Sequence, residues 1–83
     1  MKITVKYFAA IREALGCASE VLDTDEGTLL DLRNALIARG GVIASALAHG
    51  KAVRMAVNQT LSPDATQLKD GDEVAFFPPV TGG

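Results

Sequence analysis

Residues 73–83 read Glu-Val-Ala-Phe-Phe-Pro-Pro-Val-Thr-Gly-Gly, an alternating strand pattern that runs directly into a tail of prolines and glycines. Side chains alternate between the two faces of a strand, so the first five residues present apolar groups to both faces. The two prolines fix φ and favour an extended stalk, which ends the strand. We therefore predict a folded domain over residues 1–77 and a flexible tail over residues 78–83.

Four other segments have the alternation of strands or lie between turn signals. They are residues 2–8, 19–24, 52–57 and, as a short return strand, 60–62. Asn58-Gln59 predicts a turn between the last two.

Helical spacing of apolar residues follows the first strand and fills the middle of the chain. Residues 9–15 predict a short helix that ends at Gly16. Thr28 precedes the main amphipathic helix, and Thr28 with Asp31 resembles a capping box. Gly40-Gly41 predicts the end of that helix. The apolar positions of the main helix are Leu29, Leu32, Leu36 and Ile37, and residues 42–47 are expected to form one more helical turn.

The predicted order of main elements is strand, strand, helix, strand, strand. Two hairpin-like pairs around one main helix indicate an α+β domain with a mixed sheet covered on one face. The first and last strands then lie side by side in the centre of the sheet. This arrangement is the ubiquitin-like β-grasp, with the sheet packed on one main helix.

One helix covers one face, which leaves the other exposed. Alternation assigns to the covered face Ile3, Val5, Val53, Met55, Val57, Val74 and Phe76. The open face would carry Phe8, Ala56, Ala75 and Phe77, ringed by Lys2, Lys6 and Arg54. A contiguous apolar patch usually marks an interface, and Phe and Arg are enriched in interface cores. A β-bulge near the strand end would instead place Phe77 in the core.

Composition excludes several classes of function. The 83 residues make one small domain, and 48% hydrophobic content suffices for a core. A net charge of −2 without a basic cluster argues against nucleic acid as a partner. No apolar run is long enough to span a membrane or to resemble a signal peptide, so we expect a cytoplasmic protein.

The sequence gives little support for a metal site or for a catalytic nucleophile. One cysteine, Cys17, excludes an internal disulfide, and no metal-ligand spacing or phosphate-binding glycine loop occurs. Cys17 and His49 lack an orienting Asn or Asp at a recognisable spacing. We expect an incidental, partly buried thiol and a solvated loop histidine.

Three segments resemble the small, sulfur-carrier subunit family of molybdopterin synthase. Residues 70–83 are similar to the C-terminal signature of that family. Its N-terminal segment is similar to the run Tyr7-Phe8-Ala9-Ala10-Ile11-Arg12-Glu13 with Gly16. Its middle strand and turn are similar to residues 56–59. Gly-Gly alone is shared with ubiquitin and the thiamine-pathway carrier. The Phe-Phe-Pro-Pro run favours the molybdopterin branch.

The resemblance implies a sulfur relay. An E1-like enzyme would use ATP to adenylate the Gly83 carboxylate, and sulfur from a persulfide donor would replace AMP to leave a thiocarboxylate. The large synthase subunit, with which the family forms a heterotetramer, would transfer that sulfur to cyclic pyranopterin monophosphate, as in molybdenum cofactor biosynthesis. The chain would itself bind no cofactor or metal, and would be a subunit of the enzyme rather than an enzyme alone.

The resemblance also assigns roles to residues. Gly83 would carry the sulfur, and Gly82 would keep the tail slim. Pro78, Pro79, Val80 and Thr81 would set the approach into the partner. Phe8 and Phe77 would anchor the partner face, with Arg12 as a polar contact near it.

Three alternatives stay open. The chain could carry sulfur for thiamine synthesis or tRNA thiolation, could be a ubiquitin-like modifier attached through Gly83, or could be an interaction domain with an idle tail.

Overall fold

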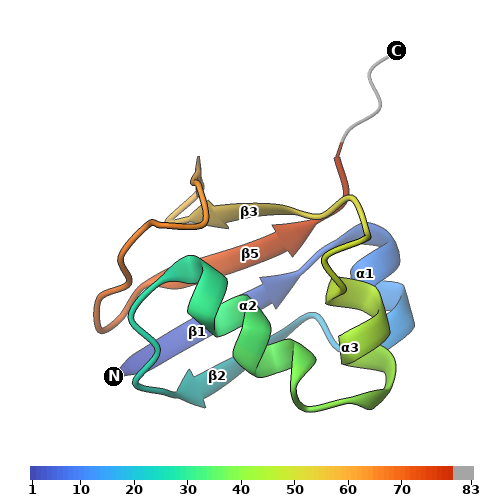
Figure 1. The fold of residues 1–83 in the computed structure, drawn as a ribbon, viewed down its shortest axis with the longest axis horizontal. Coiled ribbons are helices and arrows are strands. Elements are labelled where there is room, and N and C mark those ends of the chain that lie inside the picture. Colours follow the sequence, from blue (N-terminus) through green and yellow to red (C-terminus); the bar gives the residue numbers. More distant parts are fainter. Residues whose placement is uncertain (80–83) are drawn as a thin grey trace.

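The computed structural model describes residues 1–79, and its five strands and three helices follow the predicted order (Figure 1). The strands are β1 (Lys2–Tyr7), β2 (Ser19–Asp23), β3 (Arg54–Val57), β4 (Thr60–Leu61) and β5 (Glu73–Phe77). The helices are α1 (Ala9–Leu15), α2 (Leu29–Ile37) and α3 (Gly41–Leu47).

The sheet has the strand order β2-β1-β5-β3-β4. The first and last strands are parallel and central, while β2 and β3 flank them in antiparallel pairings. Thr4 lies opposite Glu73 and Tyr7 opposite Phe76, so β1 and β5 are in register over four residues. The predicted mixed β-grasp sheet, with its two terminal strands side by side, is confirmed.

The core lies between the sheet and the helices. In Figure 1, α2 crosses one face of the sheet, and α1 and α3 lie next to each other on the right of α2. Most core side chains come from alternate positions of the strands and from the apolar stripe of α2: Ile3, Val5, Tyr7, Met55, Val74 and Phe76 from the sheet, and Leu29, Leu32 and Leu36 from the helix. The others are Ile11 in α1, Ile43 and Leu47 in α3, and Leu68 before β5. The Tyr7 and Phe76 rings stack, with centroids 6.2 Å apart. Val53 and Val57 are partly buried against this core, so all seven side chains assigned to the covered face contribute to it.

The main helix begins after Thr28 as predicted and ends at Ile37, shortly before the predicted stop at Gly40 and Gly41. The Thr28 hydroxyl accepts a hydrogen bond from the Asp31 N–H at 3.1 Å, which satisfies one of the free donors of the first turn. Gly40 and Gly41 both have positive φ, of 76° and 65°. Because an L side chain disfavours that region, these two glycines let the chain reverse into α3.

One buried charge joins α2 to α3. The Arg33 guanidinium donates to the carbonyls of Leu47 and Ala48 at 2.8 and 3.0 Å, at the end of α3. Burial lowers the pKa of Arg33, and the charge of Asp64 opposes that shift. The side chain therefore satisfies helix-terminal carbonyls that lack an intrahelical donor.

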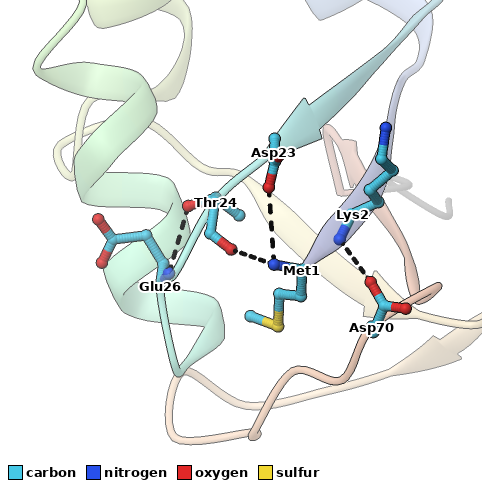
Figure 2. Close-up of polar contacts among 6 residues, drawn as sticks. All are labelled: Met1, Lys2, Asp23, Thr24, Glu26 and Asp70. Carbon is cyan, nitrogen blue, oxygen red and sulfur yellow. Dashed lines mark hydrogen bonds and ion pairs between the residues drawn. The ribbon is translucent and has the colours of Figure 1, made fainter.

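The start of β1 is held on both sides (Figure 2). The Met1 ammonium donates to the Thr24 carbonyl at 3.1 Å and lies 3.6 Å from the Asp23 carboxylate. On the other side, the Lys2 N–H donates to Asp70 Oδ1 at 2.6 Å, and the Gly71 N–H donates to the Lys2 carbonyl. These contacts fix the register of the central strand pair at its N-terminal end, opposite the end at which β5 leads into Pro78.

Four strand boundaries differ from the prediction, and β2 and β4 each end one residue earlier than expected, at Asp23 and Leu61. Residues 52–53 precede β3 instead of belonging to it, and Phe8 follows β1 as the residue that caps α1. Phe8 is therefore placed by the turn after the strand and not by strand alternation.

Candidate docking site

An open groove of about 740 Å³ lies on the sheet face away from the helices. Its apolar lining comes from the turn after β1, from β3, β4 and β5, and from the residues after β5. These lining residues are Phe8, Ala9, Ala56, Leu61, Ala75, Phe77, Pro78 and Pro79. Phe8 and Leu61 are 44% and 62% exposed, which is high for large apolar side chains. The predicted apolar patch on the uncovered face is present.

Two small residues form the floor of the groove. Ala56 and Ala75 lie directly opposite each other on β3 and β5. Each is less than 10% exposed although it faces away from the core. Larger lining side chains rise around the two methyl groups, so the sheet is hollowed there, as a site for an inserted apolar side chain needs.

Backbone contacts fix Phe8 at the groove. The Phe8 N–H donates to the Phe76 carbonyl at 3.1 Å, and the Phe8 carbonyl accepts from Ile11 and Arg12 at the start of α1. Ala9 has a φ of 51°, a left-handed conformation that is uncommon for alanine. The chain thus turns sharply between β1 and α1, with Phe8 at the bend.

Three polar side chains complete the lining. The Lys6 ammonium and the Glu73 carboxylate form an ion pair at 3.0 Å. Gln59, in the turn between β3 and β4, is the third. The groove is therefore mostly apolar, with a neutralised charge pair and an amide on its edge.

The β3–β4 turn is supported from β5. The Asn58 amide donates to Asp72 Oδ1 at 2.9 Å, and its carbonyl oxygen accepts from the Glu73 N–H at 3.0 Å. The other Asp72 oxygen accepts from the Lys69 N–H at 2.8 Å. This network explains why an asparagine begins the turn and holds the turn against the central strand.

The structure brings together four of the predicted site residues. Phe8, Phe77, Pro78 and Pro79 line the groove, and Phe77 is half-buried on the open face, so a bulge that would place it in the core is absent. Arg12 lies exposed on α1 and does not line the groove. Val80, Thr81, Gly82 and Gly83 lie outside the described residues.

Four lining residues were not predicted from the sequence: Ala9, Gln59, Leu61 and Glu73. Leu61 pairs with Ala56 across the β3–β4 hairpin. Its place in a return strand beside an alanine of the open face could have predicted that it lines the groove. Gln59 gave no signal beyond its place in a predicted turn.

The titratable groups away from the groove serve the fold. The Tyr7 hydroxyl donates to Glu20 Oε2 at 2.7 Å, and Arg39 binds the other Glu20 oxygen at 3.0 Å. Burial, then the bond to Glu20, raises the pKa of Tyr7, and the same carboxylate raises the pKa of Arg39.

Cys17 is exposed, so the expectation of a partly buried thiol was wrong. His49 is exposed and bonds to the Asn34 side chain.

Residues 1–79 contain neither a metal-binding cluster nor a membrane-spanning helix. No group of three or more His, Cys, Asp or Glu side chains in that range could hold a metal ion. No helix in that range is long and apolar enough to cross a membrane.

Comparisons with known proteins extend over nearly the whole chain. Residues 5–83 match the model of the ThiS family. The molybdopterin synthase sulfur carrier subunit of Escherichia coli (strain K12) is 47% identical over 81 residues, which cover 98% of this chain and 99% of that protein. Small archaeal modifier protein 3 of Haloferax volcanii is 34% identical over 92 residues, with both chains fully covered.

A solved structure adds a partner to the comparison. A chain in the protein–protein complex of subunits 1 and 2 of molybdopterin-converting factor from Helicobacter pylori superposes with a TM-score of 0.70, at 28% identity and with both chains fully covered. The chain therefore belongs to the ThiS family, with a ubiquitin-like β-grasp fold, and is similar along its length to sulfur carrier subunits of molybdopterin synthase.

Proposed function

We propose that the chain is the sulfur-carrier subunit of a molybdopterin synthase. The α-carboxyl group of Gly83 carries the sulfur, and the groove docks the large subunit. One observation carries the proposal: Pro78 and Pro79, which lead into residues 80–83, are themselves part of the groove lining. A protein that binds in the groove therefore contacts the segment that leads into residues 80–83.

The chemistry needs an external activating enzyme. A carboxylate is ionised at neutral pH and is a poor electrophile. In the proposed relay, a Gly83 carboxylate oxygen attacks the α-phosphorus of ATP on an E1-like enzyme and pyrophosphate leaves. A persulfide sulfur then attacks the acyl carbon and AMP leaves. A thiol reduces the resulting acyl disulfide, which leaves the thiocarboxylate on Gly83.

Delivery then depends on position. Docking of the groove holds the thiocarboxylate near the large subunit's site, so that its effective concentration there is high. The carrier needs no acid or base of its own. In this proposal the acceptor is cyclic pyranopterin monophosphate, the assembly is a heterotetramer and the compartment is the cytoplasm.

Mass spectrometry of the tryptic peptide spanning residues 70–83 tests the relay. The protein is incubated with ATP, a sulfur source and an E1-like activating enzyme. We expect a mass gain that matches sulfur in place of oxygen at Gly83. The peptide contains no Met or Cys, so side-chain oxidation at sulfur does not imitate this gain. An unchanged peptide, with an enzyme shown to be active on a known carrier, would contradict the relay.

A second candidate function follows from the relative named as a modifier. Small archaeal modifier protein 3 covers the full chain at 34% identity. A modifier would form isopeptide bonds from Gly83 to lysines of other proteins. A ladder of conjugates on a denaturing gel that disappears with Gly83→Ala would favour this function over the synthase subunit.

Partner identity separates the remaining carrier pathways. Co-purification with the large subunit of molybdopterin synthase supports the proposal. Co-purification with a thiazole synthase or a tRNA-thiolating enzyme in its place would assign the chain to one of those pathways.

A further inference from the structure

Gln59 stands apart from the other polar residues of the groove. Lys6 and Glu73 neutralise each other at 3.0 Å. The Gln59 side chain makes no hydrogen bond to any residue between 1 and 79 and is exposed at the groove edge. Its amide therefore keeps a complete set of donors and acceptors for another molecule.

The backbone at Gln59 is unfavourable for a glutamine. Asn58 and Gln59 have φ values of 50° and 70°, the pattern of a type I′ hairpin turn. Asn-Gly is the preferred pair for that turn, because glycine adopts positive φ without steric cost. Asn58 is explained by its bonds to Asp72 and Glu73. Nothing in the turn explains why a side chain is kept at the next position.

A non-glycine residue held at positive φ points to a role for its side chain, because the conformation alone is better served by glycine. Here the residue lines the same groove as Ala56 and Ala75. An amide is neutral and both donates and accepts, which matches the N–H and C=O of a peptide group. At the edge of an apolar hollow, it can bind the main chain of a segment whose side chain fills the floor.

We propose that Gln59 is a specificity-determining residue of the docking site. Its side-chain amide hydrogen-bonds a main-chain peptide group of the large subunit, at a segment that inserts an apolar side chain into the groove. The inference rests on the docking function proposed above. A partner that places a charged group at this edge would be rejected, since a neutral amide cannot compensate a desolvated charge.

Two variants separate binding from stability. Gln59→Gly removes the amide and relieves the backbone, so its Tm should equal or exceed that of the wild type. Gln59→Asn keeps an amide in a residue that tolerates positive φ but shortens its reach by one methylene. Gln67→Ala is the matched control, because Gln67 is an exposed glutamine that does not line the groove.

The measurement is calorimetric titration with the large subunit of molybdopterin synthase from the same organism, together with thermal unfolding of each carrier variant. We expect Gln59→Gly and Gln59→Asn to raise Kd about three- to tenfold, the range for loss of one or two hydrogen bonds. Gln67→Ala should bind like the wild type. A purely structural turn residue would give an unchanged Kd.

The outcomes distinguish the inference from the function that it rests on. Wild-type affinity in Gln59→Gly, at an equal or higher Tm, overturns the role of Gln59 and leaves docking intact. Absence of binding by the wild type overturns the docking function, and the role of Gln59 with it. Weaker binding by Gln59→Gly at undiminished Tm supports both.

Discussion

Phe77 packs partly within the domain and partly lines the open groove. Its neighbours Val74, Ala75 and Phe76 are buried, whereas Phe77 is half-buried and lines the groove. The last residue of β5 is thus the point at which the central strand passes from the core to the groove.

Phe77→Ala should weaken binding to the large subunit by about 2 kcal/mol, because a buried aromatic anchor is a common hot spot. Tm should fall much less than for a core phenylalanine. Calorimetric titration and thermal unfolding give the two values. Val21→Ala is the control, since Val21 is 65% exposed and does not line the groove. Loss of folding in Phe77→Ala would show that the residue is structural.

Tyr7 makes the free energy of unfolding depend on pH in the alkaline range. Burial and the bond to Glu20 raise the pKa of Tyr7 above its ordinary value of 10.0, so the folded protein holds the phenol proton more tightly than the unfolded chain. That contribution is complete below pH 10 and is lost as pH rises through the folded pKa.

Tyr7→Phe should lower the free energy of unfolding by about 1 kcal/mol at neutral pH and flatten its decline above pH 10. The chain has one Tyr and no Trp, so ultraviolet absorbance of the folded protein reports Tyr7 alone. Appearance of tyrosinate near pH 10 without unfolding would contradict the buried hydrogen bond.

At the scale of elements, the helices depend on side chains that bind backbone at their ends. The Thr28 hydroxyl caps the N-terminus of α2, and Arg33 binds the last carbonyls of α3. One of these contacts is local in sequence and follows a known motif. The other spans 14 residues and depends on how the two helices pack.

Thr28→Ala should destabilise the protein by about 1 kcal/mol, through loss of the N-cap bond. For a domain of this size, that corresponds to a fall in Tm of about 4–8 °C. Thermal unfolding by circular dichroism measures it. Ser45→Ala in α3 is the control, because Ser45 is exposed within a helix and should leave Tm unchanged or slightly higher. Equal Tm values for Thr28→Ala and wild type would show that the cap does not contribute.

Arg33→Leu should lower the free energy of unfolding by about 2 kcal/mol, because two carbonyls at the end of α3 lose their donors. Denaturant unfolding monitored by circular dichroism measures this change. A gain in stability would mean that desolvation of the guanidinium outweighs its two hydrogen bonds.

At the scale of the whole molecule, the two ends of the central strand pair have different roles. The contacts of Met1, Lys2 and Asp70 fix one end, and Pro78 and Pro79 follow the other, while the groove runs along β5 from Glu73 to these prolines. Figure 1 shows the N-terminus at the opposite end of the sheet from the point where β5 leads out. Pro78 and Pro79, which lead to the proposed sulfur-carrying group, therefore line one end of the groove, and Gln59 and Glu73 line the other.

Gly83→Ala should prevent sulfur loading or delivery while leaving Tm unchanged, because a methyl group widens the last residue that must enter the partner's site. Mass spectrometry of the peptide spanning residues 70–83 measures loading, and thermal unfolding measures the fold. Normal sulfur delivery by this variant would contradict the role assigned to residues 80–83.

Much of the fold could be read from local patterns. Alternation in residues 73–77 assigned each side chain of β5 to its face, and the apolar stripe of residues 29–37 with Thr28 and Gly40 bounded the main helix. These features are local: strand period, helix period, capping and positive φ depend on residues a few positions apart. The same patterns placed Phe77 on the open face.

The groove itself depends on contacts between distant residues. Alternation gives the face of each side chain but not which strands are neighbours, so the pairing of Ala56 with Ala75 and of Leu61 with Ala56 required the tertiary structure. The strain at Gln59 and the burial of Arg33 required it for the same reason. Local periodicity follows from the covalent geometry of the chain, whereas a hollow on its surface follows from the order and register in which remote segments pair.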